Sequence, residues 1–248
     1  MGVRNSYEDS AYAAAYAQLE FPGTYYLAFR DLPGILARHV SGKRALDFGC
    51  GTGRSTRWLG KLGFDAVGVD ISAEMIREAL ARDADGDYRQ VADGTVGPWP
   101  DGSFDLVLAA FTFDNIPTAD HKAGLFRALA RVLKPDGRVV NLVSAPEIYW
   151  HEWASFTTKD FPENRQAKCG DRVRIIVTAL ADQRPVEDVL WPDEAYRAVY
   201  ARTGLEVVEV HRPLGRPDEP YTWATETRIA PWVIYVLGKR ARRDLQAE

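Results

Sequence analysis

The sequence is poor in cysteine and has no long apolar run. Its 248 residues include two cysteines, Cys50 and Cys169, which cannot build a disulfide framework or hold a zinc ion by themselves. No segment approaches the roughly 18 continuous apolar residues of a membrane-spanning helix. Residues 1–16 also lack the apolar centre of a signal peptide. The sequence therefore predicts a cytoplasmic protein that neither crosses a membrane nor is exported.

The chain also lacks an excess of positive charge. Its formal net charge is −4, whereas proteins that bind nucleic-acid backbones usually present a basic face. Hydrophobic residues make up 46% and charged residues 27%, as in a globular chain with a core. We expect no nucleic-acid partner and no membrane partner.

Short apolar segments alternate with helical ones from residue 44 onward. The strands are expected at 44–48, 66–69, 88–91, 104–110 and 138–143, with helices at 55–62, 72–82 and 120–133 between them. Ser72 is the expected N-cap of its helix, with Met75, Ile76 and Leu80 on one face, and residues 134–137 (KPDG) read as a turn. Two later strands, at 205–210 and 232–237, bring the number to seven. This order predicts a doubly wound, Rossmann-like α/β fold with a mostly parallel sheet.

The rest of the chain is predicted to decorate this core within one domain, 1–248. Residues 1–40 form a helical flap, with a helix over 24–39 that Pro33 bends or restarts. The core spans 41–145. An inserted cap spans 146–191 and holds a hairpin of 173–179 and 186–191. Residues 192–248 complete the sheet, after a helix over 194–202 that Gly204 ends.

A glycine-rich loop follows the first strand, where residues 47–53 read DFGCGTG. Glycines at a strand-to-helix turn let the backbone bend sharply and let a ligand approach. A dinucleotide fingerprint would place its third glycine one position later, where Arg54 stands. Asp47 suits an ammonium group better than a pyrophosphate. Asp70, which ends the second strand, can accept hydrogen bonds from both ribose hydroxyls.

These segments together resemble the class I S-adenosylmethionine-dependent methyltransferases, in a small-molecule branch of the type 11 kind. The loop resembles the family's first motif, and VGVD (67–70), ADG (92–94) and FDLV (104–107) resemble the next three. RVLKPDG (131–137) is similar to the segment before the family's fifth strand. The resemblance covers residues 40–145, in the family's order. It implies that S-adenosylmethionine is the cofactor and S-adenosylhomocysteine the product.

The resemblance also implies which residues bind the cofactor. The loop would run beneath the methionine part, Asp47 would reach the ammonium group, and Asp70 would hold the ribose. Ile71 would pack on the adenine, Asp93 would accept from its amino group, and Phe111 would face the sulfonium. Arg30 would pair with the cofactor carboxylate, and the flap tyrosines would close over the site. The cofactor-binding residues so implied are Asp47, Gly49, Cys50, Gly51, Gly53, Asp70, Ile71, Asp93, Gly94, Phe111, Tyr16 and Arg30.

Candidate catalytic residues follow the fourth and fifth strands. They are Asp114, Tyr149 and His151, of which His151 could act as a general base near neutral pH or be an ordinary surface histidine. Relatives often carry a histidine pair where this chain has Asp114 and Asn115, so a histidine role at that place is in doubt. The four histidines are scattered, and we expect no metal.

The predicted function is methyl transfer to a small molecule by in-line displacement. The acceptor is expected to be a metabolite, with specialised metabolism as one source. A protein that binds the cofactor without methyl transfer, or a cyclase on the same scaffold, is the alternative. The displaced third glycine and Asp47 argue against a nicotinamide oxidoreductase. The acceptor, the methylated atom and a homodimer all stay open.

Overall fold

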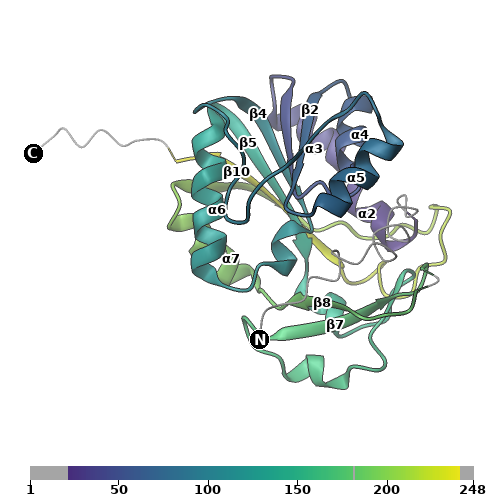
Figure 1. Cartoon of the computed structure of the whole chain (residues 1–248). Coiled ribbons are helices and arrows are strands. Elements are labelled where there is room, and N and C mark those ends of the chain that lie inside the picture. The colour runs from purple at the N-terminus through teal and green to yellow at the C-terminus, as the bar shows by residue number, and fades with distance from the viewer. Residues whose placement is uncertain (1–21, 181, 241–248) are drawn as a thin grey trace, which may run out of the picture.

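The computed structural model describes residues 22–180 and 182–240, so Tyr16 lies outside the described residues. A seven-stranded sheet with the order β3-β2-β1-β4-β5-β10-β9 forms its centre (Figure 1). The first five strands of this order run parallel, and β10 is antiparallel to both β5 and β9. The strands are β1 (Arg44–Phe48), β2 (Asp65–Asp70), β3 (Asp87–Gln90), β4 (Phe104–Ala110), β5 (Leu133–Ser144), β9 (Leu205–His211) and β10 (Trp232–Lys239). The predicted doubly wound α/β fold is confirmed.

The strand order reverses between β1 and β4. From β1 the chain winds outward through β2 to β3, then returns to place β4 on the other side of β1 and β5 beyond it. In such sheets the loops at the carboxyl ends of the two central strands diverge and leave a crevice for a ligand. The glycine loop follows β1 and Phe111 follows β4, so both lie at this crevice.

Helices cover both faces of the sheet (Figure 1). One apolar layer joins the helices α2 to α4 to side chains of β4, β5 and β10, and the other joins α6 and α7 to the opposite face. Ser72 caps α5 as predicted, because its hydroxyl accepts from the Met75 N–H. The helices are α2 (Thr24–Arg30), α3 (Leu32–His39), α4 (Arg54–Lys61), α5 (Ala73–Arg82), α6 (Ala119–Val132) and α7 (Asp193–Ala201).

A second, three-stranded sheet lies beyond the carboxyl ends of the central strands (Figure 1). Its strands are β6 (Phe156–Thr157), β7 (Arg172–Val177) and β8 (Val186–Val189), and β7 and β8 form the predicted hairpin. The 3₁₀ turns η3 (Pro146–Tyr149) and η4 (Pro162–Gln166) flank β6. A further 3₁₀ turn, η2 (Thr112–Asn115), follows β4 and packs against β8.

The structure corrects two local predictions. Residues 134–137 do not form a turn, because β5 already begins at Leu133 and pairs with β4 through a register shift near Phe104. Leu80 is 39% exposed, and Ala79 takes its place beside Met75 and Ile76 on the buried face of α5. Both errors come from reading the sequence one residue at a time without the neighbouring strand.

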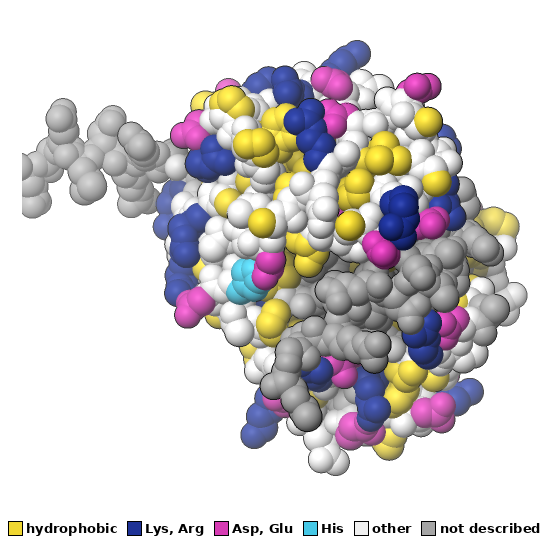
Figure 2. Space-filling view, in the orientation of Figure 1, with side chains coloured by type: hydrophobic (Ala, Val, Ile, Leu, Met, Phe, Trp, Pro, Cys, Tyr) yellow, Lys and Arg dark blue, Asp and Glu magenta, His cyan; other side chains and the backbone are white. Residues whose placement is uncertain are grey.

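The surface of the described residues carries charges of both signs. On the face shown in Figure 2, basic side chains alternate with acidic ones rather than forming a continuous track. Among residues 22–180 and 182–240, none of the helices combines the length and the apolar composition that crossing a bilayer requires.

Candidate functional site

The glycine loop turns through three left-handed residues. Gly49, Gly51 and Gly53 have φ values of 73°, 53° and 77°. A Cβ on Gly49 would lie 2.3 Å from Thr112 Oγ1, and one on Gly53 would lie 2.7 Å from the Tyr88 ring. A Cβ on Gly51 would meet no atom within 4 Å. Gly49 and Gly53 are therefore required by the packing of the loop, whereas Gly51 faces the open space that a ligand would occupy.

Asp70 connects this loop to the end of β2. Its Oδ2 accepts from the Gly51 N–H at 2.9 Å, and its Oδ1 accepts from the Ser72 N–H at 2.9 Å. Burial raises the pKa of this carboxyl, while the two N–H donors act in the opposite direction. The arrangement fixes a carboxylate at the crevice, with the remaining lone pairs of its oxygens available to hydroxyl groups.

Asp47 lies beneath the loop and is fully buried. Ser55 Oγ and Thr56 Oγ1, both on α4, donate to its Oδ2 at 2.6 Å each. Its Oδ1 is buried without a hydrogen-bond partner among the described residues. Burial raises the pKa of Asp47 to about 6, against the effect of the two hydroxyls. An unpartnered acceptor of this kind is completed by a cationic or N–H donor, which is what the ammonium group of the cofactor would supply.

The cofactor-binding residues expected after β2 and β3 form the outer rim of the crevice. Ile71 is 45% exposed, so its side chain is available to cover an aromatic ring. The Asp93 side chain is 71% exposed and lies 3.2 Å from His121 Nε2 on α6. Gly94 follows with a φ of 76° and open space around it. Cys50 differs, because its side chain packs into the cluster under α5 and leaves only backbone for a ligand.

Phe111 stands at the inner end of the crevice in a strained conformation. Its φ is 65°, and it is the one non-glycine residue with a positive φ among the residues that the structure describes. This turn lifts the chain out of β4 into η2 and places the Phe111 ring 4.7 Å from the Trp232 ring and 5.8 Å from the Tyr25 ring. The three rings, with Phe156, line a cavity of about 40 Å³. Arg54, at the start of α4, lies over the other side of Tyr25 at 5.2 Å.

The same cavity has a polar wall. Asp114 accepts from the Ser144 N–H, at 3.0 Å to Oδ2, and Tyr196 donates to its Oδ1 at 3.5 Å. The Tyr149 hydroxyl donates to Asp188 Oδ2 at 3.0 Å. Asp114 and Asp188 are 5% and 8% exposed, and both line the cavity. The structure thus brings together two of the three predicted catalytic residues, Asp114 and Tyr149.

The structure places His151 apart from them. Its ring lies 6.2 Å from the Trp153 ring and lines an outer hollow with Glu152, Lys159 and Arg165, which Tyr149 separates from the inner cavity. The general-base role of His151 stays a prediction, and no contact of the described structure joins its ring to Asp114.

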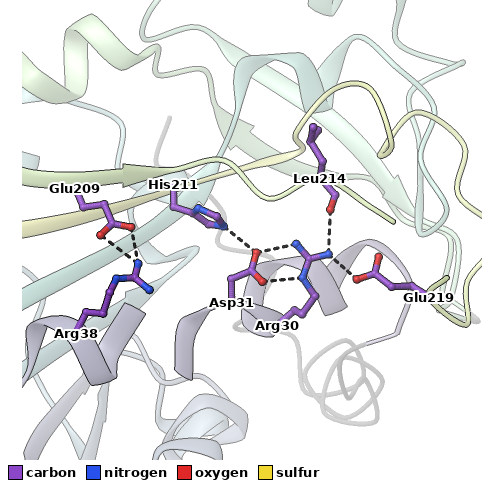
Figure 3. A network of polar contacts seen from close by, with 7 residues as sticks. All are labelled: Arg30, Asp31, Arg38, Glu209, His211, Leu214 and Glu219. Atoms are coloured by element: carbon purple, nitrogen blue, oxygen red, sulfur yellow. Dashed lines mark hydrogen bonds and ion pairs between the residues drawn. The ribbon is translucent and has the colours of Figure 1, made fainter. Parts of the chain in front are cut away.

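Arg30 is held in a network of its own (Figure 3). Its guanidinium donates to both oxygens of Asp31, at 2.8 and 2.7 Å, to the Leu214 carbonyl at 2.9 Å and to Glu219 at 2.5 Å. His211 reaches the same Asp31 carboxyl at 2.8 Å. The network joins α2 to residues 212–229, here called the strap, which connects β9 to β10. Arg30 would have to give up these partners to bind a cofactor carboxylate, so the geometry does not favour that expected role.

Sequence reasoning missed Asp188, which lines the inner cavity, and Lys122, whose charge acts on both Asp114 and Asp188. Lys122 is fully buried on α6, with its Nζ donating to the Phe113 carbonyl and lying 4.7 Å from the Trp191 ring centre. The sequence around each of these residues indicates a position on a buried face. Asp188 stands two residues after Val186 on a strand, so it shares the inward face. Lys122 stands three and four residues before Leu125 and Phe126, so it lies on the apolar face of its helix.

Among the residues that the structure describes, no group of three or more histidine, cysteine or acidic side chains has the arrangement of a metal site. The crevice instead combines a glycine turn, the carboxylate of Asp70, the exposed Ile71 and the unpartnered oxygen of Asp47. These features fit a cofactor with an aromatic base, a ribose and an ammonium group.

Comparisons with known proteins agree with this geometry. Residues 46–141 match a family model described as a methyltransferase domain. The chain is 36% identical over 105 residues to a demethylmenaquinone methyltransferase of Tropheryma whipplei (strain Twist), a match that covers 41% of each chain. It is 32% identical over 105 residues to a ubiquinone biosynthesis O-methyltransferase of Burkholderia vietnamiensis, covering 41% of this chain and 44% of the relative. These matches span less than half the length of the curated relatives.

A solved structure extends the likeness of the fold to nearly the whole chain. The CcbJ methyltransferase of Streptomyces caelestis superposes with a TM-score of 0.65 at 18% identity, over 96% of this chain and 99% of the other. At this identity the likeness shows the fold alone. The methyltransferase-domain match covers β1 to β5 with the glycine loop, Asp70 and the inner end of β4, which are the elements that build the crevice. The domain match over residues 46–141 and the shared fold support the resemblance of this chain to the class I S-adenosylmethionine-dependent methyltransferases.

Proposed function

We propose that the protein transfers the methyl group of S-adenosylmethionine to a small molecule. One observation carries the proposal: the glycine loop, tied to Asp70 through the Gly51 N–H, packs against Thr112, the residue that directly follows Phe111 of the cavity wall. A cofactor bound along this crevice would have its reactive end at the cavity. When bound, S-adenosylmethionine supplies an electrophilic methyl group on a sulfonium.

The residues of the crevice have separate tasks in this proposal. Asp70 accepts the ribose hydroxyls, and Asp47 supplies the buried charge for the ammonium group. Ile71 covers one face of the adenine, and Asp93 accepts from its amino group. Phe111 closes the space beside the sulfonium, where its ring excludes water from the methyl group. The remaining contacts of the methionine part come from the loop glycines and from the backbone of Cys50.

A flat, apolar acceptor fits the inner cavity best. Its walls are the rings of Tyr25, Phe111, Phe156 and Trp232, and its polar groups are confined to one side. The relatives named for demethylmenaquinone and ubiquinone biosynthesis support an acceptor of quinone-like shape. A cavity of about 40 Å³ holds one or two waters and no aromatic ring, so its walls must part for the acceptor. Tyr25 on α2 and Phe156 on β6 are aromatic walls that lie outside the large sheet.

Calorimetry with S-adenosylmethionine and S-adenosylhomocysteine tests the proposal. The wild-type protein is expected to bind both, and Asp70→Asn is expected to lose at least tenfold in affinity, since a charge-assisted hydrogen bond contributes about 1.5–3 kcal/mol. Asp65→Asn is the matched control, because it removes an exposed carboxylate from the other end of the same strand. Asp65→Asn should bind like the wild type. Absence of binding in the folded wild-type protein would refute the proposed cofactor.

Product formation separates an enzyme from a protein that only binds the cofactor. Incubation with a library of small aromatic acceptors should yield S-adenosylhomocysteine in proportion to methylated product. Cofactor binding without product from any acceptor would favour the binding-protein alternative. A changed substrate with the cofactor intact would favour a cyclase.

A further inference from the structure

The polar wall of the inner cavity holds two carboxyl groups from different parts of the chain. Asp114 stands on η2, directly after the central strand β4, and Asp188 stands on β8 of the small sheet. The two elements pack against each other, and both side chains line the cavity. The carboxyl pair is therefore formed by the packing of the small sheet against the core.

Each carboxyl group is held by a defined donor. The Ser144 N–H donates to Asp114 at 3.0 Å, and the Tyr149 hydroxyl donates to Asp188 at 3.0 Å. Both donors come from the segment that leaves β5, so the carboxyl pair is fixed to the end of that strand. Rigid support of this kind is typical of groups that act in a reaction.

The charges around the pair do not balance if both groups are ionised. Lys122 is the cation at this place, and burial lowers its pKa to about 8. Burial also raises the pKa of both carboxyl groups, and repulsion by Asp114 adds to the effect on Asp188. Two carboxylates that share a buried site hold on to one proton. The titratable or charged groups that act on the pair or on Lys122 are Tyr149, Tyr196, Tyr200 and Cys169, together with Glu187, whose side chain points outward and acts on Asp188 through its charge alone.

We infer that the Asp114–Asp188 pair is the proton acceptor for a hydroxyl group of the methyl acceptor, which makes the substrate a phenol or hydroquinone methylated on oxygen. The inference rests on the proposed function. One carboxyl group keeps the shared proton, and the other stays ionised at the cavity surface. The aromatic walls bind the ring of the acceptor, and the polar wall turns its hydroxyl toward the pair.

Proton transfer to the pair and methyl transfer to the acceptor need no further reactant. The O–H bond of the acceptor breaks, and its proton moves to the ionised carboxylate of the pair. The freed electron pair forms the new O–C bond as the S–C bond of the sulfonium breaks and leaves a neutral thioether. The proton then leaves the pair for solvent when the cavity opens to release the product. An arylamine or a thiol of the same shape gains less from this arrangement, because an arylamine attacks through its lone pair before it loses a proton and a thiol ionises more readily by itself.

The shared proton can be measured without an acceptor. Infrared spectra of the wild type at pH 7.5 should show the C=O stretch of a protonated carboxyl group, which Asp188→Asn should remove. Glu187→Gln is the matched control, because Glu187 is the outward neighbour on β8 and pairs with Arg172. Glu187→Gln should keep the band. Absence of the band from the wild type, or its survival in Asp188→Asn, would overturn the inference.

Turnover supplies the second readout. The acceptor library should pair phenols, naphthols and hydroquinones with the corresponding amines and thiols, with S-adenosylhomocysteine as the product measured. We expect hydroxyl members to be turned over fastest, and Asp188→Asn and Asp114→Asn to lower kcat by about 10²-fold or more with an unchanged Kd for S-adenosylmethionine. The melting temperature of each variant checks its fold.

The outcomes separate the two proposals. Failure of the wild type to bind S-adenosylmethionine would refute the proposed function. Three outcomes would refute the hydroxyl inference alone. They are cofactor binding without turnover of any hydroxyl compound, faster turnover of amines or thiols than of hydroxyl compounds, and a wild-type kcat in both aspartate variants.

Discussion

Replacing Asp47 with asparagine should change how the stability of the protein depends on pH. The fold buries this carboxyl completely and, within residues 22–180 and 182–240, leaves its Oδ1 without a hydrogen-bond partner, so folding disfavours the ionised form. Its pKa rises from 3.8 to about 6. Each pKa unit corresponds to about 1.36 kcal/mol, so the ionised group lowers the free energy of unfolding by about 3 kcal/mol at neutral pH.

The raised pKa of Asp47 determines whether the free energy of unfolding rises or falls with pH. The folded protein binds the proton more tightly than the unfolded chain does, so the associated stability is present below about pH 4 and is lost as the pH rises through about 6. About half of the change falls between pH 5 and pH 8, in a range where the protein can be handled. Asp47→Asn cannot ionise and should lack this loss.

Urea unfolding at a series of pH values measures the effect. The difference in unfolding free energy between Asp47→Asn and the wild type should grow in favour of the variant by about 1–1.5 kcal/mol from pH 5 to pH 8. Asp114 and Asp188 titrate in both proteins, so their contributions cancel in the difference. If this difference in unfolding free energy stays constant from pH 5 to pH 8, Asp47 ionises as it does in water. The conclusion that its carboxyl is buried away from water beneath the loop would then be wrong.

Three further substitutions test other parts of the structure. Gly51→Ala should abolish measurable S-adenosylmethionine binding, because we place Gly51 at the crevice. Its melting temperature should equal that of the control Gly63→Ala, since both sites have a positive φ and open space around them. Equal S-adenosylmethionine binding by the two variants would contradict the placement of Gly51 at the cofactor. Ile71→Ser should weaken S-adenosylmethionine binding several-fold in calorimetry, whereas Leu62→Ser, a comparably exposed site away from the crevice, should not. Arg30→Met should destabilise the protein by about 2 kcal/mol and expose the strap to limited proteolysis, since it removes hydrogen bonds to two carboxylates; unchanged cleavage would show that the network does not hold the strap.

The cofactor half of the site could be predicted from the sequence because its parts are close together along the chain. A strand, a glycine turn, a helix and the acid at the end of the next strand occupy residues 44–70, and the predicted bounds of β1 and β4 match the structure. Each signal in this stretch is local: the turn holds Gly49, Gly51 and Gly53 at positive φ, a conformation that favours glycine. Ser72 is recognisable as a cap from the helix that follows it.

Arg30 shows what such reasoning leaves out. An arginine on a helix of the N-terminal flap has the charge to bind a carboxylate, and the sequence suggested the carboxylate of the cofactor. The structure instead supplies two carboxylates of the chain itself, from the adjacent Asp31 and from Glu219 on the strap (Figure 3). The partner 189 residues away could not be identified from the pattern around Arg30.

The acceptor half of the site depends on tertiary structure for a similar reason. The groups around the inner cavity come from η2, η3, β8 and β10, which are separated by tens of residues and by a segment without clear periodicity. The sequence does show charged residues at positions that are expected to be buried: an acid on the inward face of β8 and a lysine on the apolar face of α6. Each would be costly alone, because a buried charge needs a partner. Asp188 lines the cavity together with Asp114, and the positive charge of Lys122 favours the ionised form of both carboxyl groups, so the lysine reduces the cost of burying either one. Polar residues at core-facing positions in two distant elements can therefore indicate a shared site before the fold is known.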